Sequence, residues 1–325
     1  MLQHSRISFA LLLGFGLLGC EARTTPEAES TAAGRKGTIG VSLMTLTNPF
    51  FKVIGDTIDQ QAGQSGYNVV VLGADEDAAK QTAQVKDFIV QGVAAIVLAP
   101  YDSRAIGPVI SEASAAGIPV FTVDNACLAD DCQVVSHVAT DNTMGGEQAG
   151  HALIEALDGR GGAIAVLDHK VTESCIRRVE GFKKVLADYN QNADNKIEIV
   201  SELPSGGNRP TGHRATKDIM QAHGDLVGIF AINDPSALGA YAALKEDGKV
   251  DQVVIIGFDG QPEGKKAIRD GKIYADPIQF PDRMAAETVR MILKHFDGEP
   301  VPTEILIPTA LYRQADGKAD VSLED

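Results

Sequence analysis

The sequence predicts an α/β fold made of two lobes, each a doubly wound parallel sheet. From Lys36 onward, short apolar runs of strand length alternate with stretches of helical spacing. Such alternation is typical of a parallel sheet with helices on both faces. The alternation begins again near Val134, which indicates two similar halves. The chain has 325 residues, 44% of them hydrophobic, and is therefore long enough for two domain-sized cores.

The first half is predicted to contain four strands and three helices. The strands fall at residues 38–44, 67–72, 93–98 and 118–123, and the helices at residues 48–65, 76–91 and 103–116. Gly66, Gly92 and Gly117 follow the three helices, where a glycine readily ends a helix.

The second half repeats this order. Strands are predicted at residues 134–139, 163–167, 197–201, 226–231 and 253–257, and helices at 141–157, 173–189, 209–222 and 235–246. Asp141 is a plausible N-cap of the first of these helices. A further helix at 282–296 and a strand at 303–307 follow a short strand-like segment at 274–278.

The N-terminus has the pattern of an export signal. His4 and Arg6 precede an apolar run over residues 7–18, which is too short to span a bilayer comfortably. Cys20 then follows a small residue, which resembles the lipobox of bacterial lipoproteins. We therefore expect residues 1–19 to be a lipoprotein signal peptide and Cys20 to be acylated. Ordinary signal cleavage beside an incidental cysteine is the alternative.

Residues 20–36 are predicted to form a flexible tether, because they are rich in Thr, Ala, Glu and Ser and contain almost no large apolar side chains. No second apolar run is long enough to span a membrane. The net charge of −15 argues against a nucleic-acid partner, since phosphate binding needs clustered Lys and Arg.

Three cysteines remain in the body of the chain. Cys127 and Cys132 flank four residues and could close a small loop by a disulfide, which export permits. Two free thiols are the alternative. Neither these two nor Cys175 suggests a metal site, because no second cysteine pair follows and the seven histidines are scattered.

Polar side chains follow several predicted strands, and doubly wound sheets bind ligands at the carboxyl ends of their strands. The positions are Asn48, Asp124, Asn233 with Asp234, Asp259 and Gln279. Each could instead be a helix cap or a turn former. As a set they suit a neutral polyol, because carboxylates and amides can bridge neighbouring hydroxyls.

Phe50 and Phe51 offer flat apolar faces to a sugar ring, although core packing is the usual role of such a pair. The chain contains no Trp, so any stacking must come from Phe or Tyr.

Short motifs along the chain, in order, resemble the ribose-binding protein family, the pentose and hexose group of type I periplasmic binding proteins. The resemblance extends from about residue 36 to about residue 311. The matching stretches are Asn48-Pro49-Phe50-Phe51, residues 66–72, 117–120, 134–142, 145–146, 178–182, 233–234 with 237–240, and Gly257-Phe258-Asp259-Gly260.

This resemblance implies two lobes, joined by a three-segment hinge, that close over one sugar. The first lobe would comprise residues 37–140 and 280–309, and the second residues 141–279 and 310–325. The implied sugar contacts are Asn48, Phe50, Phe51 and Asp124 from the first lobe, Arg178, Asn233 and Asp259 from the second, and Gln279 at the hinge. Arg177 is the candidate if the alignment shifts by one residue.

Two positions depart from the ribose binders. Asn125, which we also count among the predicted ligand contacts, replaces an arginine after Asp124, and residues 205–209 lack the aromatic side chain that would cover the second face of the sugar. Unpaired buried polar groups discriminate strongly between similar ligands. We therefore expect a sugar or polyol related to ribose, and we expect the Cys127–Cys132 segment to shape the pocket rim.

The predicted function is an extracytoplasmic solute-binding lipoprotein. It would be a cofactor-free monomer, exported to the periplasm or cell surface, that delivers a monosaccharide to the permease of an ATP-binding-cassette transporter. A receptor that presents a sugar or quorum signal to a membrane sensor is the alternative.

Two further classes fit less well. A carbohydrate-active enzyme could use Asp124 and Asp259 as paired carboxylates, but the chain lacks a phosphate loop, a nucleophile elbow and a zinc-protease motif. A sugar-responsive repressor would need an N-terminal helix-turn-helix, where this chain has an export signal.

Overall fold

The computed structural model describes residues 36–324. The predicted signal peptide at 1–19, the acylation of Cys20 and nearly all of the tether at 20–36 lie outside the described residues. Within residues 36–324, no helix is both long and apolar enough to cross a bilayer.

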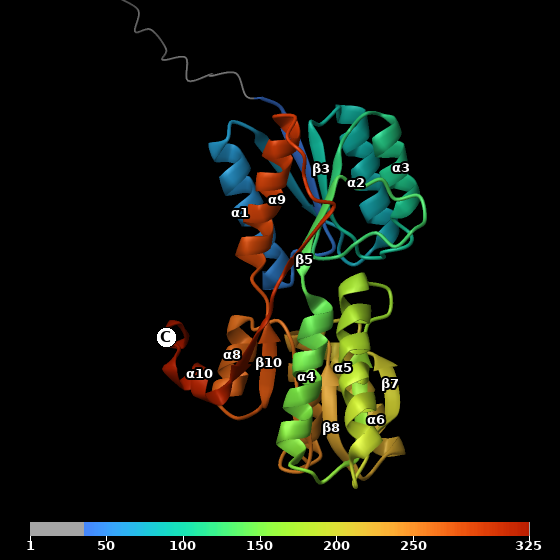
Figure 1. The fold of residues 1–325 in the computed structure, drawn as a ribbon, viewed down its shortest axis with the longest axis vertical. Helices are drawn as coiled ribbons and strands as arrows, with labels where there is room; N and C mark the ends of the chain where they lie inside the picture. Colours follow the sequence, from blue (N-terminus) through green and yellow to red (C-terminus); the bar gives the residue numbers. More distant parts are fainter. Residues whose placement is uncertain (1–35, 325) are drawn as a thin grey trace, which may run out of the picture. The chain divides into compact units, whose positions relative to one another are not determined.

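The first lobe is built on a six-stranded sheet in which all strands are parallel and run in the order β11-β5-β4-β3-β1-β2. The strands are β1 (Thr38–Leu43), β2 (Asn68–Gly73), β3 (Ala95–Ala99), β4 (Val120–Val123), β5 (Ser136–Thr140) and β11 (Glu304–Ile307). Helices α1 (Pro49–Gln64) and α9 (Pro281–Phe296) cover one face, and α2 (Ala78–Gln91) and α3 (Gly107–Ala115) cover the other (Figure 1).

The second lobe repeats this plan with the strand order β12-β10-β9-β8-β6-β7. Its strands are β6 (Gly162–Asp168), β7 (Ile197–Pro204), β8 (Leu226–Ala231), β9 (Val254–Ile256), β10 (Ala275–Ile278) and β12 (Ala310–Arg313). Its helices are α4 (Asn142–Leu157), α5 (Glu173–Asn192), α6 (Arg209–Ala222), α7 (Asp234–Glu246), α8 (Pro262–Arg269) and α10 (Gln314–Ala319), followed by the 3₁₀ turn η1 (Val321–Leu323). Helices α4 and α5 pack on one face, and α6 and α7 pack on the other.

The chain passes between the two sheets at three places. The crossings lie between β5 and α4, between β10 and α9, and between β11 and β12. The predicted fold of two doubly wound lobes joined by a three-segment hinge is therefore confirmed. Gln279 lies in the second crossing, and Thr309 in the third.

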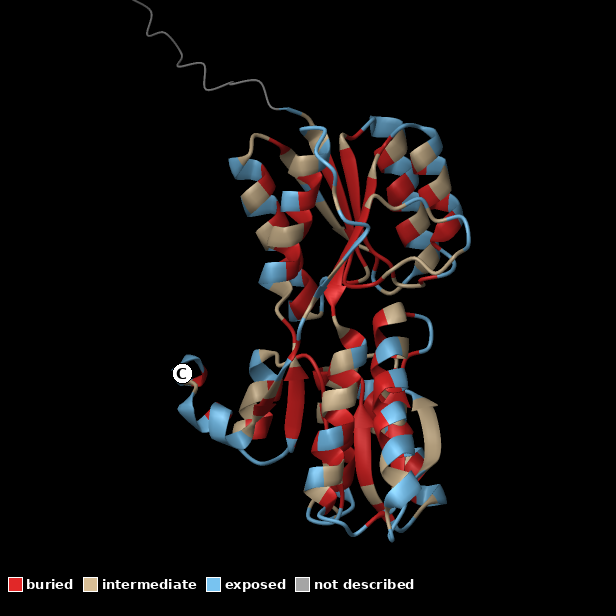
Figure 2. Ribbon diagram, in the orientation of Figure 1, coloured by how far each residue is buried: buried red, intermediate tan, exposed pale blue. Residues whose placement is uncertain are grey.

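Both sheets are buried between their helices, which is why the strands read as continuous apolar runs. Every residue of β3 and β4 is buried, whereas the edge strands β2 and β7 are largely half-buried (Figure 2). The polar residues that follow the carboxyl ends of the central strands are therefore attached to a buried part of the sheet.

Four elements differ from the prediction. Strand β12 pairs antiparallel with β10, and helices α8 and α10 were not predicted. The predicted helix at 103–116 begins only at Gly107, because residues 103–106 form turns in which Asp102 accepts hydrogen bonds from the backbone N–H groups of Arg104 and Ala105. Because Ser103 lies in these turns and not in α3, its backbone N–H donates to the carbonyl of Val171 instead of to a helix carbonyl.

Candidate ligand-binding site

Two aspartates stand just beyond the carboxyl ends of central strands in unusual backbone conformations. Asp124 directly follows β4 with φ of 66°, and Asp259 lies shortly after β9 with φ of 104°. Residues other than glycine are strained when φ is positive, and residues in such conformations are frequent at functional sites. Both residues line the space between the lobes.

All nine side chains predicted as ligand contacts line one cavity between the lobes. They are Asn48, Phe50, Phe51, Asp124, Asn125, Arg178, Asn233, Asp259 and Gln279. About 460 Å³ of this space is free of protein atoms, part of it open to solvent.

Arg178 is the cation of the cavity and is only 3% exposed. Its Nε donates to Asn142 Oδ1 at 2.8 Å, and its Nη1 donates to the carbonyl of Ile232 at 2.6 Å and to Asp259 Oδ1 at 3.0 Å. The guanidinium lies over the ring of Phe258, 3.9 Å from its centroid. Its Nη2 makes no hydrogen bond with the described residues and is available to a ligand.

The neighbouring Arg177 points away from the cavity. Its side chain is half exposed and pairs with Glu173 and Glu180 on the same helix, at 2.9 and 3.2 Å. The structure therefore selects Arg178, not Arg177, as the cavity arginine.

Asp259 is held by several donors. Its Oδ1 accepts hydrogen bonds from Arg178 and from Gln279 Nε2 at 2.6 Å, and its Oδ2 accepts from Gln261 Nε2 at 3.2 Å. Burial raises the pKa of this carboxyl group, while Arg178 and these donors oppose the rise. Asp259 thus orients Arg178 and Gln279 as well as facing the cavity.

Asp124 is in the opposite situation, because its Oδ1 has no hydrogen-bond partner although the residue is only 3% exposed. Burial raises its pKa to about 7, and the charge of Arg178 opposes part of that rise. The Oε1 atom of Gln279 is also buried without a partner. A native protein rarely leaves buried acceptors unpaired, so this cavity calls for a ligand with hydroxyl or N–H donors.

Two predicted site residues are also helix caps. Asn48 Oδ1 accepts from the N–H of Phe50 at the start of α1, and Asn233 Oδ1 accepts from the N–H of Ser236 at the start of α7. The cap interpretation is therefore correct for both residues, and both still line the cavity. The amide nitrogen of Asn48 has no partner among the described residues, whereas that of Asn233 donates to the carbonyl of Gly207 at 2.9 Å.

The two lobes line the cavity with different groups. Phe50 and Phe51 form an edge-to-face pair with ring centroids 5.1 Å apart, and both also belong to the core of the first lobe. Gly206 and Gly207 line the cavity from the second lobe, each with positive φ and no side chain. The first lobe thus contributes phenyl groups to the lining, and the second lobe contributes two glycines without side chains.

Several cavity residues were not predicted. Glu76 and His169 lie just after β2 and β6, so the rule that found Asp124 also pointed to them. Burial raises the pKa of Glu76 and lowers that of His169, which favours the neutral imidazole. Cys175, the free buried cysteine, completes this side, and burial raises the pKa of its thiol.

Cys127 and Cys132 are joined by a disulfide, as one of the two alternatives from the sequence predicted. Among residues 36–324, no group of three or more His, Cys, Asp or Glu side chains could hold a metal ion.

Comparison with known proteins identifies the family. The sequence family described as periplasmic binding protein domain matches residues 39–300 of this chain. The chain belongs to the periplasmic binding protein family. The predicted resemblance is therefore confirmed, and the name of the family places its members outside the cytoplasmic membrane.

Curated relatives match nearly their whole length. The ribose import binding protein RbsB of Escherichia coli (strain K12) is 37% identical over 84% of this chain and 89% of that protein. RbsB of Bacillus subtilis (strain 168) is 34% identical over 95% and 98%. A D-apiose import binding protein of Paraburkholderia graminis is 31% identical over 84% and 86%. These relatives are named as import binding proteins, which favours binding over catalysis.

Solved structures of transporter solute-binding proteins have the same fold. One from Bacillus halodurans with bound myo-inositol superposes with a TM-score of 0.80 and 26% identity, covering 89% of this chain and 98% of that one. One from Actinobacillus succinogenes with bound D-allose gives a TM-score of 0.79 at 26% identity, covering 88% and 100%.

Proposed function

We propose that this chain captures a neutral monosaccharide or related polyol outside the cytoplasm and delivers it to the permease of an ATP-binding-cassette transporter. The observation that carries the proposal is the cavity between the lobes. It combines unpaired acceptors on Asp124 and Gln279, unused donors on Arg178, and two phenyl rings. A compact polyhydroxylated ring satisfies all of these groups together.

The charge of the cavity favours a neutral ligand. The carboxyl groups of Asp124, Asp259 and Glu76 line it, and Arg178 is already paired with Asp259. An anionic sugar phosphate would meet a surplus of acceptors, whereas hydroxyls can donate to them.

Affinity would come from closure of the lobes on the sugar. A sugar held by Asn48 and Asp124 of the first lobe gains contacts with Arg178 and Asp259 of the second lobe only when the lobes are together. Because these contacts exist only in the closed arrangement, the sugar shifts the equilibrium toward it. A permease could then recognise the closed form through both lobe surfaces.

The preferred sugar is expected to differ from ribose. The amide of Asn125 donates to the carbonyl of Pro100 at 3.1 Å and accepts from the N–H of Ser174 at 3.4 Å. The ribose binders have an arginine at this position. Asn125 offers the sugar no guanidinium group in its place, and its amide is already bonded to protein groups. Gly206 and Gly207 also present no side chain to the cavity. The myo-inositol and D-allose bound by the two structural neighbours are larger than ribose, which supports testing six-carbon ligands first.

We further propose that Cys20 carries a lipid anchor and that the body works as a monomer at the periplasmic or outer face of a membrane. The lipobox-like residues before Cys20 support the anchor. Metabolic labelling with a palmitate analogue tests it: wild type should incorporate the label, and Cys20→Ser should not. Equal labelling of both would remove the anchor from the proposal.

A thermal-shift panel tests the sugar proposal. D-ribose, D-allose, D-apiose and myo-inositol are compared with D-ribose 5-phosphate as a charged control. A ligand at a hundred times its dissociation constant stabilises the folded state by about 2.7 kcal/mol. At least one neutral compound should raise the melting temperature, and the phosphate should not. Absence of any stabilisation by neutral sugars or polyols would reject the proposal.

A further inference from the structure

Two loops of the first lobe receive the N-terminus of α5 from the second lobe. The N–H of Ser103 donates to the carbonyl of Val171 at 3.0 Å, and the Oγ of Ser103 accepts from the N–H of Glu173 at 3.0 Å. Asn125 Oδ1 accepts from the N–H of Ser174 at 3.4 Å. We call these three hydrogen bonds the α5 latch. They hold the lobes together without a ligand atom.

The loop at residues 124–135, between β4 and β5, supports this latch, and we call it the disulfide loop. The N–H of Leu128 donates to the carbonyl of Ser103 at 2.6 Å, so the loop holds the residue that makes two of the three latch bonds. Burial raises the pKa of the Glu173 carboxyl group, and the nearby backbone of Ala126, next to Cys127, opposes part of that rise. The loop thus contacts both partners of the latch.

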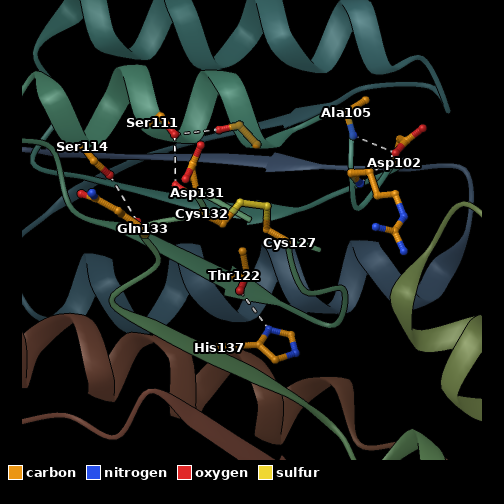
Figure 3. Close-up of a disulfide and its surroundings, with 12 residues drawn as sticks. Asp102, Ala105, Ser111, Ser114, Thr122, Cys127, Asp131, Cys132, Gln133 and His137 are labelled. Atoms are coloured by element: carbon orange, nitrogen blue, oxygen red, sulfur yellow. Dashed lines mark hydrogen bonds between the residues drawn. A yellow bond between two sulfur atoms is a disulfide. The ribbon is translucent and has the colours of Figure 1, made fainter. Parts of the chain in front are cut away.

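The disulfide loop is itself fixed on α3. Ser111 Oγ donates to the carbonyl of Asp131, and Ser114 Oγ donates to the carbonyl of Gln133, both at 3.2 Å (Figure 3). The loop also packs closely on Gly107, where an added Cβ would come within 2.4 Å of the Cβ of Ala129.

The disulfide lies at the centre of this packing. The Sγ atoms of Cys132 and Cys127 would be 3.7 and 3.8 Å from a Cβ at position 107, and both cysteines pack against the apolar core on the α2 and α3 side. Neither cysteine lines the ligand cavity. Any effect of the disulfide on ligand binding must therefore pass through the loop.

We infer that the Cys127–Cys132 disulfide positions the α5 latch and thereby strengthens lobe closure and ligand affinity. The inference rests on the proposed function for its effect on sugar binding, but not for its effect on the latch. Without the covalent link the loop gains conformational freedom that it must lose again whenever α5 docks. The closed arrangement becomes less populated, and the apparent affinity falls by the same factor.

A double-mutant cycle tests whether the disulfide acts through the latch. One change is the pair Cys127→Ser with Cys132→Ser, and the other is Ser103→Ala, which removes the Oγ acceptor for Glu173. Binding of D-allose, D-ribose and myo-inositol is measured by calorimetry. Each change should weaken binding about threefold to tenfold, the effect of one hydrogen bond. The combination should be no worse than the stronger single change.

Multiplicative losses in the cycle, or unchanged affinity on removing the disulfide, would overturn the inference. Dithiothreitol treatment of folded wild type provides a second route if the serine variant folds poorly. Its two thiols supply the two electrons and two protons that convert the disulfide to two cysteines. Reduced wild type should match the serine variant in affinity.

Hydrogen exchange separates this inference from the proposed function. The backbone amides of Glu173 and Ser174 should exchange faster in the reduced or serine protein than in the oxidised one, with or without sugar. Amides of β8, far from the loop, serve as the control and should not change. If no sugar binds but these two amides still respond, the latch stands and the sugar proposal fails. If their exchange is unaltered, the disulfide does not position the latch.

Discussion

Replacing Asp124 by asparagine should weaken sugar binding and at the same time make the sugar-free protein more stable at high pH. The substitution keeps the size and shape of the side chain and removes its charge. Asparagine also tolerates the left-handed backbone found at this position, φ of 66°, at least as well as aspartate. Any change therefore reports on the buried carboxylate and not on backbone strain.

The size of the stability effect follows from the pKa. Burial raises the pKa of Asp124 to about 7, against 3.8 for an ordinary aspartate. The folded protein therefore holds this proton more tightly than the unfolded chain does. The stabilisation that comes from this tighter proton binding is fully present below pH about 4 and is lost as the pH rises through about 7. Between pH 5 and pH 8 the loss amounts to about 2–3 kcal/mol.

The assay is urea unfolding of both proteins at pH 5 and at pH 8, together with calorimetry of sugar binding. Asp158→Asn is the matched control, because Asp158 is also left-handed, with φ of 48°, but exposed. The gain in stability of Asp124→Asn over wild type should be about 2–3 kcal/mol larger at pH 8 than at pH 5. Sugar affinity should fall about tenfold to a hundredfold, as expected for a lost hydrogen bond to a charged group.

Two results would refute this reasoning. If the gain in stability is the same at both pH values, the carboxyl group does not carry a raised pKa in the folded protein. If Asp124→Asn binds the sugar as well as wild type does, the unpaired oxygen is not a ligand contact.

Three further predictions concern neighbouring groups. Arg178→Lys keeps the charge but cannot bond Asn142 and Asp259 together, so urea unfolding should show a loss of about 2–4 kcal/mol; unchanged stability would contradict the buried network. Sugar affinity should decline as the pH falls from 8 to 5, because bound hydroxyls favour ionised Asp124; calorimetry showing tighter binding at pH 5 would reverse the assigned role. Gln279→Leu removes the unpaired acceptor and also the donor to Asp259 Oδ1, so urea unfolding should show a loss of about 1–3 kcal/mol and binding should weaken about tenfold; an unaffected dissociation constant would exclude Gln279 from the site.

Much of the fold was predictable because local signals agreed with the tertiary structure. Helix α6 and strand β8 have the predicted bounds, and Gly92 ends α2 in the left-handed conformation expected of a C-cap glycine. Strand β12 was not predictable from local pattern, because its four residues are organised by antiparallel pairing with β10, a strand of the same sheet that lies far away in the sequence. Helices α8 and α10 are too short for a clear period.

The site was predictable in part for a similar reason. Parallel strands bring their carboxyl ends to one edge of each sheet, and two such lobes facing each other form a cleft there, so Asp124 and Asp259 could be placed on opposite sides of one cleft from sequence. Glu76 was missed because its position was read as the start of a helix, whereas α2 begins at Ala78 and Glu76 has positive φ. The bond from Ser174 to Asn125 depends on how the lobes meet, and no local pattern encodes that contact.

The most direct test of the account is a crystal structure of the protein grown with the neutral sugar or polyol that stabilises it most. The account predicts the ring against Phe50 and Phe51, with one hydroxyl donating to Asp124 Oδ1 at about 2.5–3.0 Å and another oxygen accepting from Arg178 Nη2. A sugar bound elsewhere, or a cavity in which Asp124 and Arg178 make no contact with it, would contradict the central claim.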